Sequence, residues 1–147
     1  MSEDNASTTQ AAVVATPVPP EILAPAGSRA AFLAAVAAGA DAVYCGLKQF
    51  SARMEAKNFQ LEELAQLTAL AHEKGVRVYV TLNTLLKPPE TGAMAELLKA
   101  LSRQVRPDAL IVQDLGVIRL ARQVGFKGEL HLSTLANVSF PAALDLI

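Results

Sequence analysis

His131 is the residue of this sequence best suited to moving a proton, because an unperturbed imidazole titrates near neutral pH. It lies in the apolar run Leu130–Leu132, and the hydroxyl of Ser133 and the amide of Asn137 follow shortly after. We therefore expect His131 to be catalytic, with Ser133 and Asn137 binding the substrate through hydrogen bonds. The alternative is a structural histidine, which would need a hydrogen-bond partner if it were buried.

Polar side chains also accompany three other apolar runs. Asn83 can offer a donor and an acceptor to a central pocket, or it can bond the backbone of the turn at residues 85–89. Gln113 is expected to reach inward, whereas Asp114 either contacts the substrate or caps a helix. Tyr44 either contacts the substrate or fills the interior with its ring. We treat these four residues as candidates for substrate binding.

A basic segment at residues 46–60 is longer than the two to six residues usual between a strand and a helix, and long loops of this kind are often functional. Its Arg53 could bind a phosphate or carboxylate through two parallel hydrogen bonds. Asn58 could orient a substrate or cap the helix that follows. Lys48 and Lys57 fit a solvated loop equally well. Arg53 and Asn58 are therefore the binding candidates of this segment.

The motifs of several common sites are missing. The sequence has no GxGxxG, GxxxxGK[ST], HExxH or GxSxG. Its single cysteine, Cys45, cannot form an internal disulfide or hold zinc or an iron–sulfur cluster alone, and we expect it to be a buried apolar residue. His72 lies late in a helical pattern and is expected to be structural. We predict no metal site and no cofactor bound by this chain.

These residues must be positioned by a repeating pattern of strands and helices. Apolar, strand-like runs alternate with segments of helical spacing, and each run ends in a polar or glycine-bearing turn. The runs are Ile22–Ala24, Ala42–Cys45, Val76–Leu82, Ala109–Val112 and Leu130–Leu132. Ser28, Asp114 and Ser139 are placed to cap the helices that follow their runs. Repeated β–α units of this kind predict an α/β protein with a parallel sheet.

Two architectures suit five such units. One is a complete five-stranded doubly wound sheet. The other is the first five units of a TIM-like (β/α) barrel, which typically needs about 250 residues in full. The pattern reaches only the start of a fifth helix at Ile147, as expected of part of an active-site scaffold. Spacing and composition alone leave both architectures open.

Composition excludes several classes of protein. Hydrophobic residues make up 52% of the chain and charged residues 18%, which is typical of a globular domain. No apolar run approaches the roughly 18 residues of a membrane span, and a net charge of −1 provides no global attraction to nucleic acid or lipid. Residues 1–20, rich in Ala, Thr, Val and Pro, predict a disordered tail before a domain at 21–147. A single cysteine fits a cytoplasmic location.

Seven short segments, in order, resemble peptidase family U-32, the collagenase-like protease family. They are Glu21–Gly27, Gly39–Tyr44, Phe50–Arg53, Ala56–Phe59, Tyr79–Thr84, Asp108–Asp114 and His131–Asn137. The resemblance implies a barrel-like catalytic domain, of which residues 21–147 would be the N-terminal part, and so favours the barrel over the doubly wound sheet. Some members are named as proteases, and others resemble hydroxylation factors that act on RNA or the ubiquinone ring.

The resemblance also implies a cofactor that this chain alone cannot hold. Several relatives bind a four-iron four-sulfur cluster, and their cysteines would lie beyond Ile147. For the full-length protein we therefore expect peptidase or iron–sulfur-assisted hydroxylase activity, with RNA, a peptide or a small anionic molecule as substrate. A barrel lyase or aldolase for a small anionic substrate, and a binding fragment without catalysis, remain the alternatives. The chain alone is expected to have neither protease activity nor bound iron.

Two spatial predictions follow. Arg53, Asn83, Gln113 and His131 should converge where the strands end, since each lies at or just past a predicted strand terminus. The last strand of an incomplete barrel should leave its edge unpaired, and unpaired edges promote association between chains. We therefore expect the isolated chain to self-associate through this edge.

Overall fold

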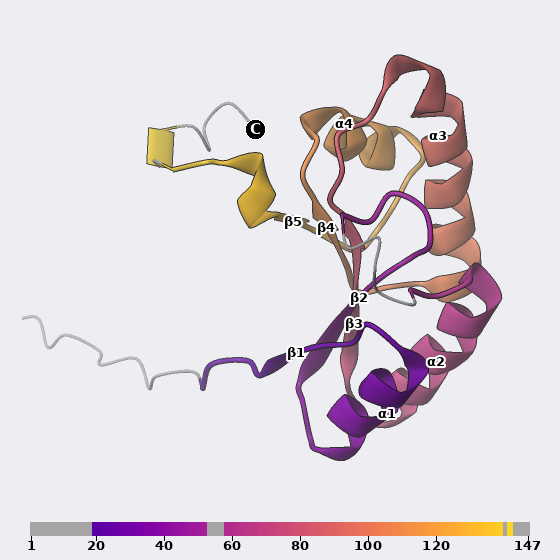
Figure 1. Cartoon of the computed structure of the whole chain (residues 1–147), viewed down its shortest axis with the longest axis vertical. Coiled ribbons are helices and arrows are strands. Elements are labelled where there is room, and N and C mark those ends of the chain that lie inside the picture. The colour runs from indigo at the N-terminus through magenta and orange to yellow at the C-terminus, as the bar shows by residue number, and fades with distance from the viewer. Residues whose placement is uncertain (1–18, 53–57, 140, 143–147) are drawn as a thin grey trace, which may run out of the picture.

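The computed structural model describes residues 19–52, 58–139 and 141–142 of the chain. They form one parallel sheet whose strands lie side by side in chain order (Figure 1). The strands are β1 (Leu23–Pro25), β2 (Ala42–Gly46), β3 (Arg77–Leu82), β4 (Ala109–Val112) and β5 (Glu129–Leu132). All five predicted strands are therefore confirmed, with ends that differ by at most one residue.

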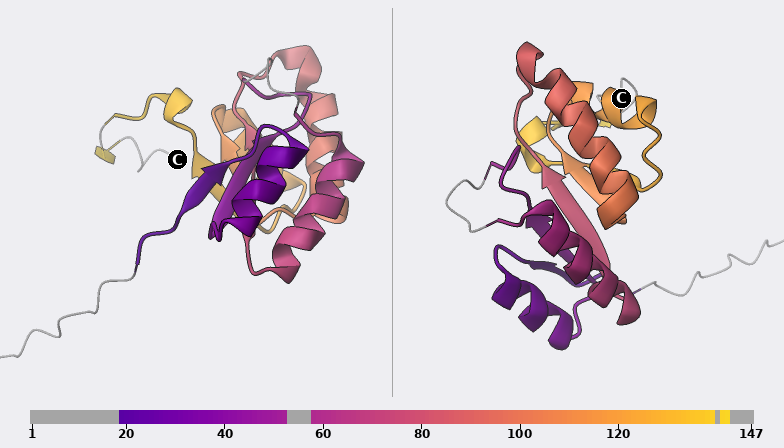
Figure 2. Two further views of the ribbon diagram at one scale, coloured as in Figure 1. Left: turned by 60° about the horizontal axis from the view of Figure 1, so that its bottom comes forward. Right: turned by 90° about the vertical axis from the view of Figure 1, so that its right-hand side faces the viewer.

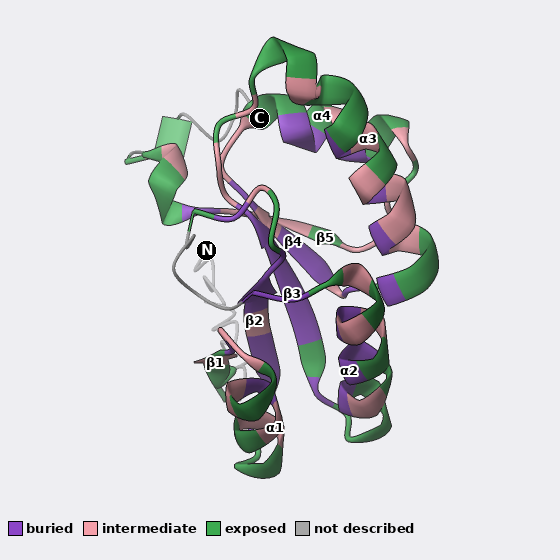
Figure 3. Cartoon of the chain, turned by 45° about the vertical axis from the view of Figure 1, so that its right-hand side comes forward, coloured by how far each residue is buried: buried purple, intermediate pink, exposed green. Residues whose placement is uncertain are grey.

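Four α-helices follow the first four strands. They are α1 (Arg29–Ala37), α2 (Leu61–Glu73), α3 (Thr91–Ala100) and α4 (Leu115–Gln123). A short 3-10 turn, Pro88–Glu90, precedes α3. Figures 1 and 2 show all four α-helices on one face of the sheet. The view coloured by burial shows their buried sides turned toward the strands (Figure 3).

The strand sequences explain this one-sided packing, because side chains alternate between the two faces of a strand. Val43, Val78 and Leu110 are fully buried and face the helices. Ala42 and Tyr79, from the alternate positions, form a second, smaller cluster on the opposite face. The helix side is thus a continuous apolar core, and the opposite face carries smaller and more polar residues.

This order of strands is that of a barrel wall. In a doubly wound sheet the order reverses beside the first strand and helices cover both faces. Here β1 pairs only with β2, and β4 pairs with β5 at the far edge of the sheet formed by the described residues. The α/β fold with repeated β–α units is confirmed. The five strands do not by themselves close a barrel.

Local signals position most helix ends as expected. Ser28 caps α1 by accepting a hydrogen bond from Ala31 N at 3.3 Å, and Asp114 caps α4. Gly39 and Gly75 follow α1 and α2 with φ angles of 83° and 73°, a region that glycine enters without steric strain. The predicted cap Ser139 precedes a segment that lies mostly outside the described residues.

The third helix ends in an unpredicted way. After α3 the chain continues as a π-helical turn, Leu101–Val105, and Arg106 then adopts a left-handed conformation with φ 55°. Leu101 and Val105, two of the apolar residues that predicted this helix, are both buried. The wider turn keeps both side chains in the core.

Two further expectations from the sequence concern the N-terminal tail and the absence of a membrane span. Apart from Pro19 and Pro20, the expected tail at 1–20 lies outside the described residues. Within the described ranges, none of the helices is both long enough and apolar enough to cross a membrane.

Candidate functional site

A cavity of about 390 Å³ lies on the face of the sheet opposite the helices, toward the carboxyl ends of the strands. Pairing between strands explains its position: Gly46, Thr81, Ile111 and His131 form one row across β2 to β5. All four line the cavity. Other lining residues come from the strand ends and from the loops that follow them: Tyr44, Ser51, Asn58, Asn83, Ser133 and Thr134.

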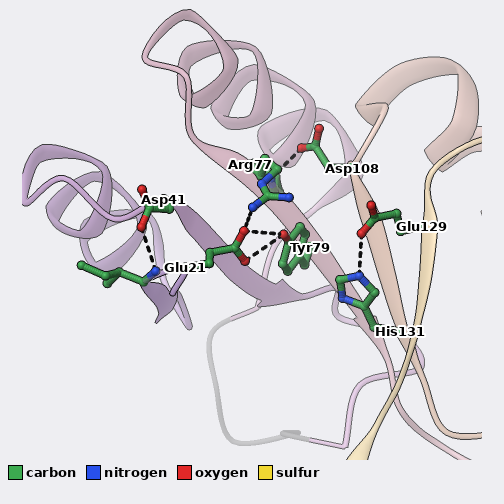
Figure 4. Close-up of polar contacts among 9 residues, drawn as sticks. Glu21, Asp41, Arg77, Tyr79, Asp108, Glu129 and His131 are labelled. Carbon is green, nitrogen blue, oxygen red and sulfur yellow. Dashed lines mark hydrogen bonds and ion pairs between the residues drawn. The ribbon is translucent and has the colours of Figure 1, made fainter. Parts of the chain in front are cut away.

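His131 is held from two sides. Its Nε2 lies 2.8 Å from Oε2 of Glu129, two residues earlier on the same face of β5. The edge of its ring packs against Tyr79 on β3, with 5.0 Å between ring centroids and an interplanar angle of 82°. Figure 4 shows the ring between these two neighbours. The histidine therefore has the hydrogen-bond partner that a structural role requires, and it also lines the cavity.

Tyr79 is fixed in turn by a charged pair at the amino ends of the strands. Its hydroxyl donates to the two carboxylate oxygens of Glu21 at 2.9 and 3.1 Å, and Glu21 forms an ion pair with Arg77 (Figure 4). The Arg77 guanidinium lies 5.8 Å from the centroid of the Tyr79 ring. Burial raises the pKa of the Tyr79 phenol, and the charge of Arg77 opposes that shift. The phenol is thus a neutral donor at physiological pH.

A close approach of two loops shapes the rim of the cavity. Asn83 Oδ1 accepts a hydrogen bond from Ala52 N at 3.1 Å, which ties the end of β3 to the loop after β2. A Cβ at Gly46 would lie 2.5 Å from Ser51 Oγ and 3.1 Å from Asn58 Oδ1, so the absence of a side chain lets this loop close over β2. Asn58 is itself buried and lines the cavity.

Three predicted binding residues are absent from the lining of the cavity, and two of them hold loops through hydrogen bonds. Gln113 Nε2 donates to the Leu135 carbonyl at 3.2 Å. Asp114 accepts from Gly116 N at 2.7 Å and from Leu86 N at 2.9 Å, so it caps α4 and holds the loop after β3. Asn137 is exposed and ends the turn that follows β5. A substrate contact by any of the three stays a prediction.

Of the remaining candidates, two line the cavity and one lies outside the described residues. Tyr44 and Ser133 line the cavity, and Ser133 Oγ also accepts from Leu135 N at 3.2 Å. Arg53 lies outside the described residues, so its predicted convergence with His131 stays a prediction. Asn83 and His131 do lie on the same cavity.

Neither a reactive thiol nor a cluster site is found in the described part of the chain. Cys45 is buried on the helix side of β2, and burial raises the pKa of its thiol from 9.0 to about 12. No group of three or more His, Cys, Asp or Glu residues that could hold a metal occurs among the described residues. An iron–sulfur cluster is normally held by four cysteines, and this sequence has one. The residues present therefore do not fit such a cluster.

Sequence reasoning overlooked several residues of this face. Glu21, Arg77, Tyr79 and Glu129 were not predicted as part of a site, and neither was the cavity-lining Thr81. The alternation of Arg77, Tyr79 and Thr81 along one strand was the available signal, since residues two apart share a face. Their partners on β1 and β5 depend on strand register, which this pattern does not give.

A parallel β–α wall with a polar cavity at its carboxyl ends is the arrangement found in part of a β/α barrel. Residues 27–147 match the model of peptidase family U32, so the chain belongs to this family. The resemblance found in the sequence is confirmed.

Relatives with quite different names share this segment. The chain is 38% identical over 119 residues to an uncharacterized protease of Methanocaldococcus jannaschii, covering 81% of this chain and 28% of that protein. It is 35% identical over 125 residues to a collagenase of Porphyromonas gingivalis, covering 84% and 30%. It is 41% identical over 118 residues to the 23S rRNA 5-hydroxycytidine C2501 synthase of Escherichia coli, covering 80% and 17%. The chain thus spans less than a third of the length of these curated relatives. No solved structure matches it.

Proposed function

We propose that this chain forms the substrate-binding wall of a U32 enzyme that hydroxylates a base in RNA. The observation that carries the proposal is the cavity, which is lined by neutral hydrogen-bonding groups and an aromatic ring. A nucleobase needs flat, apolar surroundings with a few directed donors and acceptors. Tyr44 supplies a ring, and Thr81 and Asn58 supply polar atoms at the same cavity. A relative named for making 5-hydroxycytidine in ribosomal RNA supports the same reaction class.

Proteolysis is the second candidate, because two relatives are named as a protease and a collagenase. A nucleophile must lie within about 2.6–3.2 Å of the base that activates it. Ser133 Oγ accepts a hydrogen bond from Leu135 N, and Nε2 of His131 is bonded to Glu129. Within the described part of the chain, no hydroxyl or thiol is hydrogen-bonded to a histidine. This arrangement favours hydroxylation over peptide cleavage for this part of the enzyme.

The proposal also concerns the rest of the protein. Hydroxylation replaces a C–H bond of the base by C–O–H, so it needs an oxygen donor and a two-electron oxidant that the described residues do not supply. A four-iron four-sulfur cluster held by cysteines of a longer protein would carry electrons. An RNA substrate implies a cytoplasmic enzyme. The role proposed for the present residues is to bind and orient the base.

Nucleoside analysis of RNA provides the test. The gene is deleted in its own organism, and the strain is complemented with the wild-type gene or with Thr81→Val, which keeps the shape of the side chain but removes its hydroxyl. The control is Arg119→Lys, a conservative change on α4 outside the cavity lining. We expect a hydroxylated nucleoside to disappear on deletion, to return with the wild type and the control, and to return only partly with Thr81→Val. An unchanged nucleoside profile, together with cleavage of a collagen peptide by the purified full-length protein, would overturn the proposal.

A further inference from the structure

We infer that Glu129 is a positioning residue that holds His131 in a single tautomer, with Nδ1 as the hydrogen-bond acceptor for a donor group of the ligand in the cavity. The tautomer follows from contacts within the chain. The link to a ligand rests on the proposed function.

The contact between the two side chains fixes which nitrogen carries the proton. An ionised carboxylate can only accept hydrogen bonds. Glu129 Oε2 lies 2.8 Å from Nε2 of His131, so Nε2 carries the hydrogen and donates it. In the neutral imidazole the other nitrogen, Nδ1, then bears a lone pair. Among the described residues, no hydrogen bond to Nδ1 is found.

Packing against Tyr79 restricts the rotation of the imidazole. The rings meet edge to face at 5.0 Å, and the Tyr79 hydroxyl is itself bonded to Glu21 at 2.9 Å. Arg77 pairs with the same glutamate. The contacts therefore run from Glu21, just before β1, through Tyr79 on β3 to the His131 ring, and Figure 4 shows Tyr79 and His131 as neighbours. Because His131 is held from both sides, its free nitrogen has a defined direction.

The cavity is the place where a ligand could contact this nitrogen. Of the described residues that line it, Tyr44, Cys45 and His131 are the titratable ones. Burial raises the pKa of the Cys45 thiol to about 12. His131 is the lining residue whose side chain offers a nitrogen lone pair as a hydrogen-bond acceptor.

The chemistry that this arrangement selects is a ligand with an N–H or O–H group directed at Nδ1. Such a group can donate a hydrogen bond, or its proton can transfer to Nδ1 while the bonding electron pair stays on the ligand. The resulting imidazolium would be stabilised by the Glu129 carboxylate at Nε2. The exocyclic amino group of cytosine is a donor of this kind.

The chain carries its own reference for this measurement, because it has only two histidines. Nε2 of His72 lies 2.9 Å from Oδ2 of Asp108, the same kind of contact. His72 is on α2 and is absent from the cavity lining. A change in Glu129 or a ligand in the cavity should therefore affect His131 and leave His72 as it was.

The test is nitrogen NMR of the full chain labelled with ¹⁵N-histidine, at a pH where both imidazoles are neutral. His131→Gln assigns the two rings. We expect His131 of the wild type to show a protonated Nε2 and an unprotonated Nδ1. In Glu129→Ala the two nitrogens of His131 should move toward a common shift as the tautomers mix, while those of His72 stay in place. Cytidine added to the wild type should change the shift of Nδ1 of His131 and not the shifts of His72.

Each outcome has a distinct meaning. A protonated Nδ1 in the wild type, or a Glu129→Ala spectrum identical to it, would overturn the inference. If Glu129→Ala fails to fold, both histidines change together, and the wild-type tautomer then decides the matter alone. If the tautomer is as expected but cytidine leaves Nδ1 unchanged, the assignment of Glu129 stands and the link from Nδ1 to a cytosine ligand fails.

Discussion

Cys45 shows how position decides the chemistry of a residue. A cysteine at the end of a barrel strand could be a nucleophile, but Cys45 belongs to the apolar side of β2 and faces the helices. The neighbouring position, Tyr44, faces the cavity side of the sheet. One step along a strand therefore separates a buried packing residue from a candidate for binding.

We predict that the stability of the protein depends on pH because of this thiol. Burial raises the pKa of Cys45 from 9.0 to about 12, so the unfolded chain loses the proton first and stability falls as the pH rises between these values. At pH 10 the free energy of unfolding should be lower by roughly 1–2 kcal/mol than at neutral pH because of this group. Urea unfolding at pH 7 and pH 10 measures the difference, and Cys45→Ala should lack this part of it. Equal pH dependence in the two proteins would contradict the prediction.

At the scale of elements, loops and helix ends are joined by single side chains. Asp114 is an example, since one oxygen caps α4 at Gly116 N and the other holds Leu86 N from the loop after β3. Asn83 similarly joins β3 to the loop after β2. These residues fix the rim of the cavity even where they do not line it.

Replacing Asp114 with alanine should therefore affect two elements at once. Loss of an N-cap typically lowers stability by about 1 kcal/mol, and Leu86 N loses its partner as well, so we expect a total of about 1–3 kcal/mol. Thermal or urea unfolding measures the loss. Asp114→Asn keeps an acceptor and should retain most of the stability. An Asp114→Ala protein as stable as the wild type would show that neither hydrogen bond matters in solution.

Two glycines give a matched test of packing between elements. At Gly128, just before β5, a Cβ would lie 2.6 Å from the Asp108 carbonyl oxygen and 2.6 Å from the Phe126 ring. Gly128→Ala should therefore lower the free energy of unfolding by about 1–3 kcal/mol. At Gly92, in the first turn of α3, a Cβ meets nothing within 4 Å. Gly92→Ala should raise stability by up to about 1 kcal/mol. The same change in stability in both variants would contradict this account of the two sites.

The elements themselves were predictable because their signals are local. Alternation of apolar residues, Ser28 as a cap and glycine after a helix each depend on a few neighbouring positions. The π-helical turn at Leu101–Val105 was not predictable, because the same apolar spacing suits an ordinary helix. The hydrogen bond between Asn83 and Ala52, 31 residues away, was not predictable either, because it depends on how the loop after β2 folds back.

The site was predicted less well than the fold for the same reason. The presence of His131 and Asn83 at strand ends could be expected, since parallel strands end on one side. The contacts among Glu21, Tyr79 and His131 bring together two strands and the segment before β1, and they require the register of the sheet. A single sequence indicates which residues face inward, but it does not show which of these residues contact one another.

At the scale of the whole molecule, the two edges of the sheet differ. Ala26 N donates to Tyr44 O, so the alternate residues of β1, Leu23 and Pro25, present their backbone to the free edge. Pro25 has no N–H to offer another strand, a common way of protecting an edge. At the other edge, Glu129 N and Ser133 N donate to β4, which leaves the N–H groups of Leu130 and Leu132 directed outward.

We therefore predict that the isolated chain self-associates through β5 and not through β1. Sedimentation velocity over a range of concentrations should show oligomers that grow with concentration. Leu132→Pro removes an outward N–H without touching the bonds to β4, and it should shift the distribution toward the monomer. Leu132→Ala is the control, because it loses the same side-chain packing but keeps the N–H, so it should still associate. A wild-type chain that remains monomeric, or two variants that associate alike, would show that the edge of β5 is not the contact.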